Sequence, residues 1–161
     1  MADAQRTYQI FPEEQRWTHI ALPPVKDLES SITWYEKHTH LKLLARNESD
    51  VARGAWLGDP TQTSSPFVLV LAQFLEGKDP FRGAKHTPLG PFAHIGIEVK
   101  EKSKVDEIAA LAESEGCLAL APHFRPPPVG YVCFVRDPDG NVIEFSYDQG
   151  VYEKAKEVWG G

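Results

Sequence analysis

The sequence is poor in cysteine, and this scarcity limits the ways in which the fold can be cross-linked. Among 161 residues there are only two cysteines, Cys117 and Cys133. Two cysteines are too few for a disulfide framework, and these two lack the spacing of a metal-binding cysteine motif. We therefore expect two reduced thiols and a cytoplasmic location.

The sequence also lacks long apolar runs and an excess of positive charge. No run approaches the roughly 18 consecutive apolar residues of a membrane helix, and no charged-then-apolar signal segment opens the chain. The 17 basic residues are outnumbered by 23 acidic ones, which gives a net charge of -6. Affinity for nucleic acid depends largely on clustered Lys and Arg. These absences argue against membrane and nucleic-acid partners and leave a small molecule as the expected partner.

The most informative feature of the sequence is an internal repeat. Residues 17–22 read Trp-Thr-His-Ile-Ala-Leu, and residues 92–97 read Phe-Ala-His-Ile-Gly-Ile. Both segments consist of an aromatic, a small residue, His, Ile, a small residue and an aliphatic, and their offset of 75 positions is nearly half the chain. A repeat of this length indicates two copies of one structural unit.

Each copy of the repeat is followed by an amphipathic stretch that predicts a helix. In the first half Asp27 is the expected N-cap, and apolar residues from Leu28 to Tyr35 recur at helical spacing. In the second half Ser103 is the expected N-cap, and Gly116 stands where the helix should stop.

Three strand-like runs follow each predicted helix, so both halves read strand, helix, strand, strand, strand. The runs cover residues 41–45, 51–57 and 67–74 in the first half and 118–121, 131–135 and 142–146 in the second. This order predicts an α+β fold of two tandem βαβββ modules whose curved sheets pair around a cleft.

We divide the chain accordingly into five parts. These are an N-terminal arm (1–14), a first module (15–75), a linker (76–91), a second module (92–148) and a C-terminal helix (149–161). A module of about 60 residues is marginal as an independent domain, so we expect one joint domain. Tyr152, Ala155 and Trp159 of the last helix are expected to dock on the domain or on a second subunit, in a homodimer.

Strand alternation predicts a metal site inside the cleft. The aliphatic neighbours of His19 and His94 should pack against the helices, which leaves both imidazoles on the cleft side. By the same alternation Glu144 points into the cleft from the last strand, where a buried carboxylate is costly unless it is paired or bound to a cation. Two neutral imidazoles and one carboxylate are suitable metal ligands, and three protein ligands leave positions open for substrate or water.

With these residues the chain resembles the vicinal oxygen chelate superfamily, which includes glyoxalases, bleomycin-resistance proteins, extradiol dioxygenases and fosfomycin-resistance thiol transferases. The resemblance covers about residues 15–148. It rests on the two His-containing segments, on residues 27–35, and most strongly on residues 134–145, which read Phe-Val-Arg-Asp-Pro-Asp-Gly-Asn-Val-Ile-Glu-Phe. It implies a site of His19, His94 and Glu144 for one divalent ion (Fe²⁺, Ni²⁺, Zn²⁺, Mn²⁺ or Co²⁺).

One position departs from the pattern of this superfamily. Glyoxalase I-like enzymes usually carry a fourth protein ligand on the last strand of the first module, and matching the two halves places Val70 there. Gln73 is the nearest oxygen donor, but it alternates to the opposite face unless a bulge intervenes. A three-ligand site is similar instead to those of the extradiol dioxygenases and thiol transferases.

Other residues are weaker candidates for catalysis or substrate binding. Tyr131 and Cys133 share one face of their strand, because they are two residues apart. If that face lines the cleft, Tyr131 would orient a substrate oxygen and Cys133 would contact substrate. The alternative is that both side chains pack in the core. Trp56 is a further candidate for substrate binding, and Arg53 lies on the opposite face of the same strand, so at most one of the two lines the cleft.

Basic side chains near the triple proline supply a second set of candidates. His123 and Arg125 would bind an anionic substrate or transfer a proton, with a solvated loop as the alternative. We expect Arg136 and Asp137 to form turn structure rather than a catalytic pair. The remaining histidines are expected on the surface: His38, His40 and His86.

Two functions remain open at this level. The leading hypothesis is a metal-dependent enzyme, a lyase, isomerase or ring-cleaving dioxygenase, whose substrate chelates the ion through neighbouring oxygens. The alternative is a non-catalytic protein that binds or sequesters a small molecule, like the bleomycin-resistance branch. A site contained in one chain and two sites shared across a dimer are both compatible with the sequence.

Overall fold

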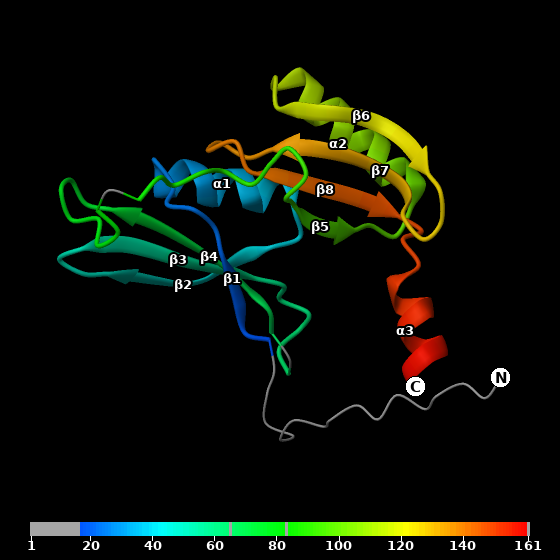
Figure 1. The fold of residues 1–161 in the computed structure, drawn as a ribbon, viewed down its shortest axis with the longest axis horizontal. Coiled ribbons are helices and arrows are strands. Elements are labelled where there is room, and N and C mark those ends of the chain that lie inside the picture. The colour runs from blue at the N-terminus through cyan, green and yellow to red at the C-terminus, as the bar shows by residue number, and fades with distance from the viewer. Residues whose placement is uncertain (1–16, 65, 83, 161) are drawn as a thin grey trace.

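The computed structural model describes residues 17–64, 66–82 and 84–160 and contains the same order of elements twice (Figure 1). The first module comprises β1 (His19–Ala21), α1 (Leu28–His38), β2 (Lys42–Glu48), β3 (Ala52–Gly58) and β4 (Val68–Phe74). The second comprises β5 (Ile95–Glu98), α2 (Lys102–Ser114), β6 (Leu118–Arg125), β7 (Gly130–Arg136) and β8 (Val142–Tyr147), and α3 (Val151–Trp159) follows. The predicted α+β fold of tandem βαβββ modules is confirmed. The arm predicted over residues 1–14 lies outside the described residues.

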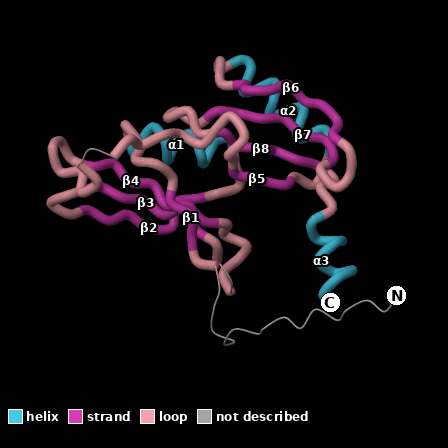
Figure 2. Tube along the Cα trace, viewed as in Figure 1, coloured by secondary structure: helices cyan, strands magenta, loops and turns pink. Residues whose placement is uncertain are grey.

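Each module forms its own four-stranded sheet with its helix packed on one face. The strand orders are β1-β4-β3-β2 and β5-β8-β7-β6, so β1 and β5 occupy equivalent edges (Figure 2). Both edge strands run parallel to their neighbours, with Ala21 beside Val70 in the first sheet and Gly96 beside Glu144 in the second. Val70 and Glu144 therefore hold equivalent positions, as the sequence match predicts.

The first helix begins where its capping residue predicts. Asp27 has extended backbone, and its carboxylate accepts a hydrogen bond of 2.7 Å from the backbone N–H of Ser30, which lowers the pKa of Asp27. Leu28, Ile32 and Tyr35 are buried on the sheet side, as expected from their spacing. The cap and the apolar stripe together fix where α1 starts and which face it buries.

The start of the second helix differs from the prediction, whereas its end agrees. The N-cap is Glu101 and not Ser103, which lies inside the first turn with its hydroxyl 3.4 Å from the Glu101 carboxylate. At the other end Gly116 has a φ of +72°, and the N–H of Cys117 reaches back 2.9 Å to the carbonyl of Ala112. A glycine suits this position because its left-handed backbone is strained for other residues.

The two modules meet where α1 packs against the turn between β7 and β8. Tyr35 donates a 2.7 Å hydrogen bond from its hydroxyl to the buried carboxylate of Asp137. Asp137 also accepts hydrogen bonds from the backbone N–H groups of Asp139 and Asn141, so the prediction that Asp137 builds the turn is confirmed. Burial raises the pKa of Tyr35 far above its ordinary value, so this junction stays protonated.

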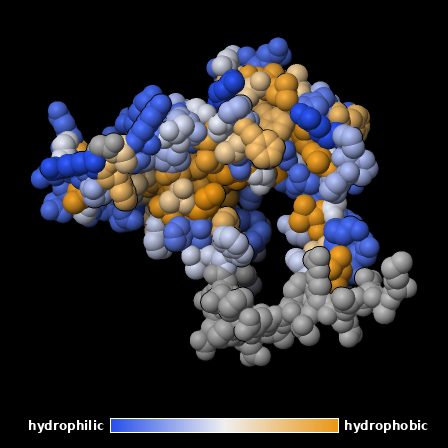
Figure 3. All heavy atoms as spheres, in the orientation of Figure 1, coloured by the Kyte–Doolittle hydropathy of each residue, from blue (hydrophilic) through white to orange (hydrophobic). Residues whose placement is uncertain are grey.

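The last helix does not bury any residue in the described part of the chain. Tyr152, Val158 and Trp159 of α3 are exposed, and the helix extends away from the two modules with hydrophobic side chains on its surface (Figure 3). The predicted docking of α3 on its own domain is thus not seen. Among the described helices, none is both long and apolar enough to cross a membrane.

Candidate metal centre

Two of the three predicted metal ligands lie together at the edge of the second sheet. His94 directly precedes β5, and Glu144 lies in the adjacent strand β8. The imidazole Nε2 of His94 is 3.5 Å from Oε2 of Glu144, whose residue is only 4% exposed. Gly96, beside Glu144, has no side chain to cover this pair.

The orientation of the His94 ring follows from its contact with a backbone carbonyl. Nδ1 lies 2.5 Å from the carbonyl oxygen of Phe92, and the ring of Phe134 packs edge-on at 5.5 Å. A carbonyl can only accept, so Nδ1 carries the hydrogen and the Nε2 of a neutral ring presents its lone pair toward Glu144. Metal-binding histidines are usually held by a contact of this kind.

The carboxylate of Glu144 has a second partner that sequence reasoning missed. Its Oε1 accepts a 3.0 Å hydrogen bond from the side-chain amide of Gln149, in the turn that follows β8. The backbone N–H of Gln149 is itself 3.2 Å from Glu98 Oε1. A glutamine in a turn has no periodicity that would have revealed this role. Oε1 of Glu144 is therefore fixed by Gln149, and Oε2 faces the imidazole of His94.

The charges of this pair favour a cation between them. A neutral imidazole lone pair facing a buried carboxylate is repulsive, and one amide donor does not compensate the buried negative charge. A proton or a metal ion between Nε2 and Oε2 would remove both penalties. His94 and Glu144 therefore fit a divalent metal as two of its ligands.

The third predicted ligand lies elsewhere in the chain. His19 belongs to the first sheet, is exposed, and has its Nδ1 2.8 Å from the hydroxyl of Thr18. Within the described ranges, only one group of three or more His, Cys, Asp or Glu side chains has ligand atoms within 4.8 Å of one another, and it contains none of the predicted ligands. A single chain therefore does not bring His19 to His94 and Glu144.

Gln73 does not lie where a fourth ligand would be needed. Pairing between β3 and β4 runs without a bulge from Ala52–Phe74 to Leu57–Leu69, so Gln73 shares the helix-facing side of the sheet with Leu71. Its side-chain oxygen accepts a 3.0 Å hydrogen bond from the backbone N–H of Leu28 at the start of α1. Gln73 thus stabilises the helix terminus, and the suggestion that it is a ligand is corrected.

The cleft-facing role of Tyr131 and Cys133 is also corrected. In the β7–β8 hairpin Phe134 is the residue beside Glu144, so Tyr131 and Cys133 point to the opposite face, toward α2. The Tyr131 hydroxyl donates to Asp106 at 2.6 Å, and the Cys133 sulfur is 3.8 Å from a helix carbonyl. The hydrogen bond to Asp106 raises the pKa of Tyr131, and burial raises the pKa of Cys133 to about 12. Both are packing residues.

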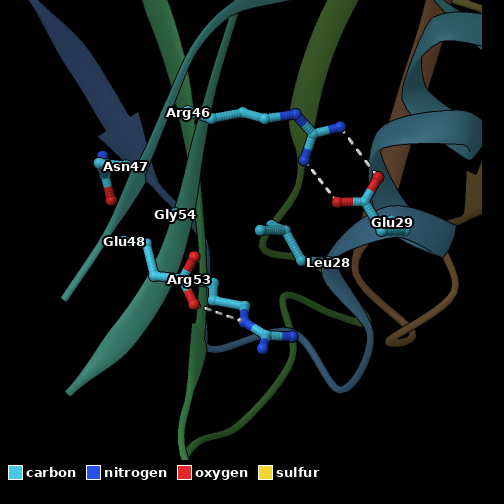
Figure 4. A pocket seen from close by; sticks show the side chains of 7 residues that line it. All are labelled: Leu28, Glu29, Arg46, Asn47, Glu48, Arg53 and Gly54. Atoms are coloured by element: carbon cyan, nitrogen blue, oxygen red, sulfur yellow. Dashed lines mark hydrogen bonds and ion pairs between the residues drawn. The ribbon is translucent and has the colours of Figure 1, made fainter. Parts of the chain in front are cut away.

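Trp56 and Arg53 lie on opposite faces of β3, as predicted. Trp56 is beside Val70 and so shares the His19 face, where it is partly exposed. Arg53 pairs with Glu48 on the helix side, at a cavity of about 370 Å³ between α1 and strands β2 and β3 (Figure 4). Arg46 and Glu29 form a bidentate ion pair in the wall of this cavity. Of the two, only Trp56 is available to a substrate beside His19.

His123 and Arg125 lie at the end of β6. His123 is beside Val132, which points to the same face of β7 as Phe134, the residue beside Glu144, so His123 shares the Glu144 face. Arg125 donates from Nε to Nε2 of His123 at 2.9 Å, and Nδ1 of His123 is 2.8 Å from the carbonyl of Ala121. Both ring nitrogens are therefore occupied, which leaves His123 unsuited to proton transfer in this arrangement. The guanidinium keeps its other N–H groups and is the better candidate for an anionic substrate.

Of the three histidines predicted on the surface, His38 is buried, whereas His40 and His86 are exposed. His38 lies three residues after Tyr35 on the buried stripe of α1, so helical spacing carried the signal for its burial. It borders a second cavity, of about 460 Å³, at the junction of the modules. Neither this cavity nor the one beside Arg53 is lined by His19, His94 or Glu144.

Comparison with known proteins gives a consistent picture. The family model of the Glyoxalase/Bleomycin resistance protein/Dioxygenase superfamily matches residues 16–145. An uncharacterized protein of Pseudomonas aeruginosa is 35% identical over 132 residues, which is 82% of this chain and 88% of the relative.

Solved structures of the same fold include an enzyme and a binding protein. The trypanothione-dependent glyoxalase I of Leishmania major aligns with a TM-score of 0.61 and 26% identity over 89% of this chain and 94% of the enzyme. An antibiotic-binding protein from a Streptomyces species aligns with a TM-score of 0.60 and 20% identity over 85% of this chain and 98% of its own, which shows a common fold. With its two βαβββ modules and a family match over most of its length, the chain belongs to the glyoxalase/bleomycin resistance protein/dioxygenase superfamily.

Proposed function

We propose that the protein is a divalent-metal-dependent enzyme whose active site is shared between two chains. His19 of one chain and His94 with Glu144 of a second chain would hold the ion. The observation that carries this proposal is the half-site at the edge of the second sheet, where a buried carboxylate and an imidazole lone pair lie 3.5 Å apart. The substrate would be a small molecule that chelates the ion through neighbouring oxygens.

The position of the ligands on sheet edges supports a site between chains. β1, with His19, and β5, preceded by His94, have equivalent places in their sheets, and each has a strand neighbour on one side only. Edge strands of this kind readily pair with another chain. If β1 of one chain lay along β5 of a second, the two histidines would meet at equivalent positions. A twofold axis would then generate two such sites per dimer.

Exposed aromatic side chains beside both histidines support the same arrangement. Trp17 and Phe92 precede His19 and His94 by two residues and are 85% and 89% exposed. Trp56, also on the His19 face, is partly exposed. Apolar groups gathered near a binding site are typical of a surface that another molecule covers. A second copy of the chain would cover them and enclose the site.

The residues of the site have separable roles. A bound divalent ion supplies Lewis-acid chemistry, because it stabilises negative charge that develops on a substrate oxygen. Gln149 holds one oxygen of Glu144, and the Phe92 carbonyl holds the His94 ring, so both ligands are oriented in advance. Trp56 would provide an apolar wall from the His19 side, and Arg125 would bind an anionic group of the substrate from the second sheet.

Mixing two inactive variants tests this proposal. His19→Ala and His94→Ala are each expected to lose metal retention and turnover. A heterodimer of the two carries both changes in one site and none in the other, so random mixing should restore roughly a quarter of the wild-type activity. Activity that stays absent in a mixture shown to contain heterodimers would contradict the shared site. Mixing His94→Ala with Glu144→Gln is the matched control, since both changes fall in the same half-site and no intact site can form.

The reaction class follows from an activity screen on metal-reconstituted protein. The hemithioacetal of methylglyoxal and glutathione tests lyase or isomerase chemistry, and catechols under air with Fe²⁺ test ring cleavage. Turnover that requires a divalent ion and is lost in Glu144→Gln is the expected result. Protein that retains no transition metal and gains no thermal stability when metal is added would instead favour the non-catalytic binding role.

A further inference from the structure

A cluster of side chains of the types that hold metal ions lies at the junction of the two modules. His38 is the last residue of α1, and Glu115 and Cys117 flank the turn between α2 and β6. One ligand atom from each of the three lies within 4.8 Å of the others, which distinguishes this group from every other His, Cys, Asp and Glu of the described residues. The cluster contains no residue of the proposed active site.

The tautomer of a neutral His38 ring follows from its contacts. Nδ1 is 3.0 Å from the backbone carbonyl of Trp34, which can only accept, so Nδ1 carries the hydrogen of a neutral ring. The lone pair then sits on Nε2, which is buried and lies 2.8 Å from Oε2 of Glu115, without hydrogen-bond geometry to that oxygen or to any other described residue. The His38 side chain is only 1% exposed. Two electron-rich atoms this close repel each other unless a positive charge lies between them.

Trp34 holds the imidazole of His38 in place. Its indole stacks on the His38 ring, with centroids 4.4 Å apart and planes 11° from parallel. Burial raises the pKa of the nearby Cys117 thiol, and the Trp34 side chain partly opposes that rise. The imidazole is therefore oriented before any ion arrives, as in sites where surrounding contacts fix the ligands.

We propose that His38, Glu115 and Cys117 form a second metal site, for a zinc-like divalent cation. Imidazole nitrogen, carboxylate oxygen and thiolate sulfur are the three ligand types that Zn²⁺ takes in proteins, and a water would complete the tetrahedron. Lys37 pairs with Oε1 of Glu115 and leaves Oε2 for the ion. The cavity of about 460 Å³ beside His38 and Glu115 supplies the path for water. A proton shared by His38 and Glu115 would neutralise the repulsion between these two side chains, but it would give no role to the nearby Cys117 thiol.

This site would link the two modules. One ligand comes from the end of the first module's helix and two come from the second module, so the ion would add a cross-link where the Tyr35–Asp137 hydrogen bond already lies. An ion that binds the folded chain and not the unfolded chain stabilises the folded state by mass action. The role is structural, and the ion would also protect the Cys117 thiol from oxidation.

Cobalt titration tests the site because cobalt bound to a thiolate has a sulfur-to-metal charge-transfer absorption. The proposed active site has no sulfur ligand, so its metal cannot produce this band. We expect the band with stoichiometric Co²⁺ in the full-length protein, in His94→Ala and in Cys133→Ser, and its loss in Cys117→Ser. No band in the wild type, or a band that persists in Cys117→Ser, would overturn the proposal and leave a protonated His38 as the explanation.

A second pair of variants checks the histidine, and a chemical measurement avoids variants altogether. Zn²⁺ affinity of the thiolate site, measured by competition with the cobalt band, should fall at least about tenfold in His38→Gln and stay unchanged in His40→Gln, whose ring is exposed. In the unmodified protein, Zn²⁺ should slow alkylation of Cys117 severalfold. Equal alkylation rates with and without Zn²⁺ would contradict the site even if His38→Gln failed to fold.

Discussion

The two modules share a topology and differ in charge at one equivalent strand position. Each sheet has its first strand parallel to its last, and Val70 in the first sheet occupies the position that Glu144 has in the second. The first module offers one imidazole on an apolar face, whereas the second offers an imidazole, a buried carboxylate and the Gln149 amide that orients it. The comparison teaches that a duplicated fold need not divide its site equally, because one strand position is enough to concentrate the charge in one half.

The largest effect is expected from removing the charge of the second module. Glu144→Gln keeps the shape of the side chain but should weaken binding of the active-site metal by about 100-fold or more, because a ligand is lost. Without metal the same variant should melt at a higher temperature than the wild type, because no uncompensated carboxylate remains buried. Metal content and thermal melts of metal-free protein check both results. A metal-free variant less stable than the wild type would show that the Glu144 charge is already compensated within the chain.

A smaller effect is expected when the support of that carboxylate is removed. Gln149→Ala should lower metal affinity by about tenfold, since the partner that orients a ligand is lost while the ligand remains. Gln73→Ala is the matched control in the first module. It should leave metal content unchanged and cost about 1 kcal/mol of folding free energy, because the backbone N–H at the start of α1 loses its acceptor. Chelator competition and urea melts measure the two effects. Loss of metal in Gln73→Ala would restore it as a ligand candidate.

Making the modules more alike sharpens the comparison. Val70→Glu places a carboxylate at the position equivalent to Glu144 and should tighten metal binding severalfold if His19 completes the site from the first sheet. It should also destabilise the metal-free protein, because a partly buried charge is added without a partner. Competition titrations with Val70→Gln as control separate charge from size. Unchanged affinity in Val70→Glu would show that the His19 face does not line the metal site.

The smallest effect concerns the thiols of the second module. Burial raises the pKa of Cys133 to about 12, so the folded state holds this proton more tightly than the unfolded chain, whose thiol has a pKa near 9. The resulting stabilisation is fully present below pH 9 and is lost as the pH rises toward 12. Cys133→Ala should therefore lose less stability than the wild type over that range. Denaturant melts at several alkaline pH values measure the difference, and identical pH profiles would contradict the burial of the thiol.

Much of the fold was predictable because the repeat and the alternation carry local information. The His-containing repeat gave the two modules, Asp27 gave a helix start, and alternation along the last strand put Glu144 on the face that His94 shares. The face of Tyr131 was not resolved by alternation alone, since both faces of β7 carry bulky side chains. It depends on the hairpin register, which pairs Phe134 with Glu144.

What the sequence could not supply was long-range placement. The position of His19 relative to His94 depends on how the modules pack, and a repeat constrains each module without constraining their arrangement. The cluster of His38, Glu115 and Cys117 escaped for the same reason, because its members come together only through packing of α1 against the second module. Helical spacing from Tyr35 would have predicted that His38 is buried, but not what it faces.

The place of β1 and β5 at free sheet edges has a consequence for how the protein would be regulated by its own abundance. If the two halves of each site come from different chains, a solitary chain has no complete site. Specific activity would then fall on dilution below the dimer dissociation constant, so that expression level, and not metal supply alone, sets the threshold at which turnover begins.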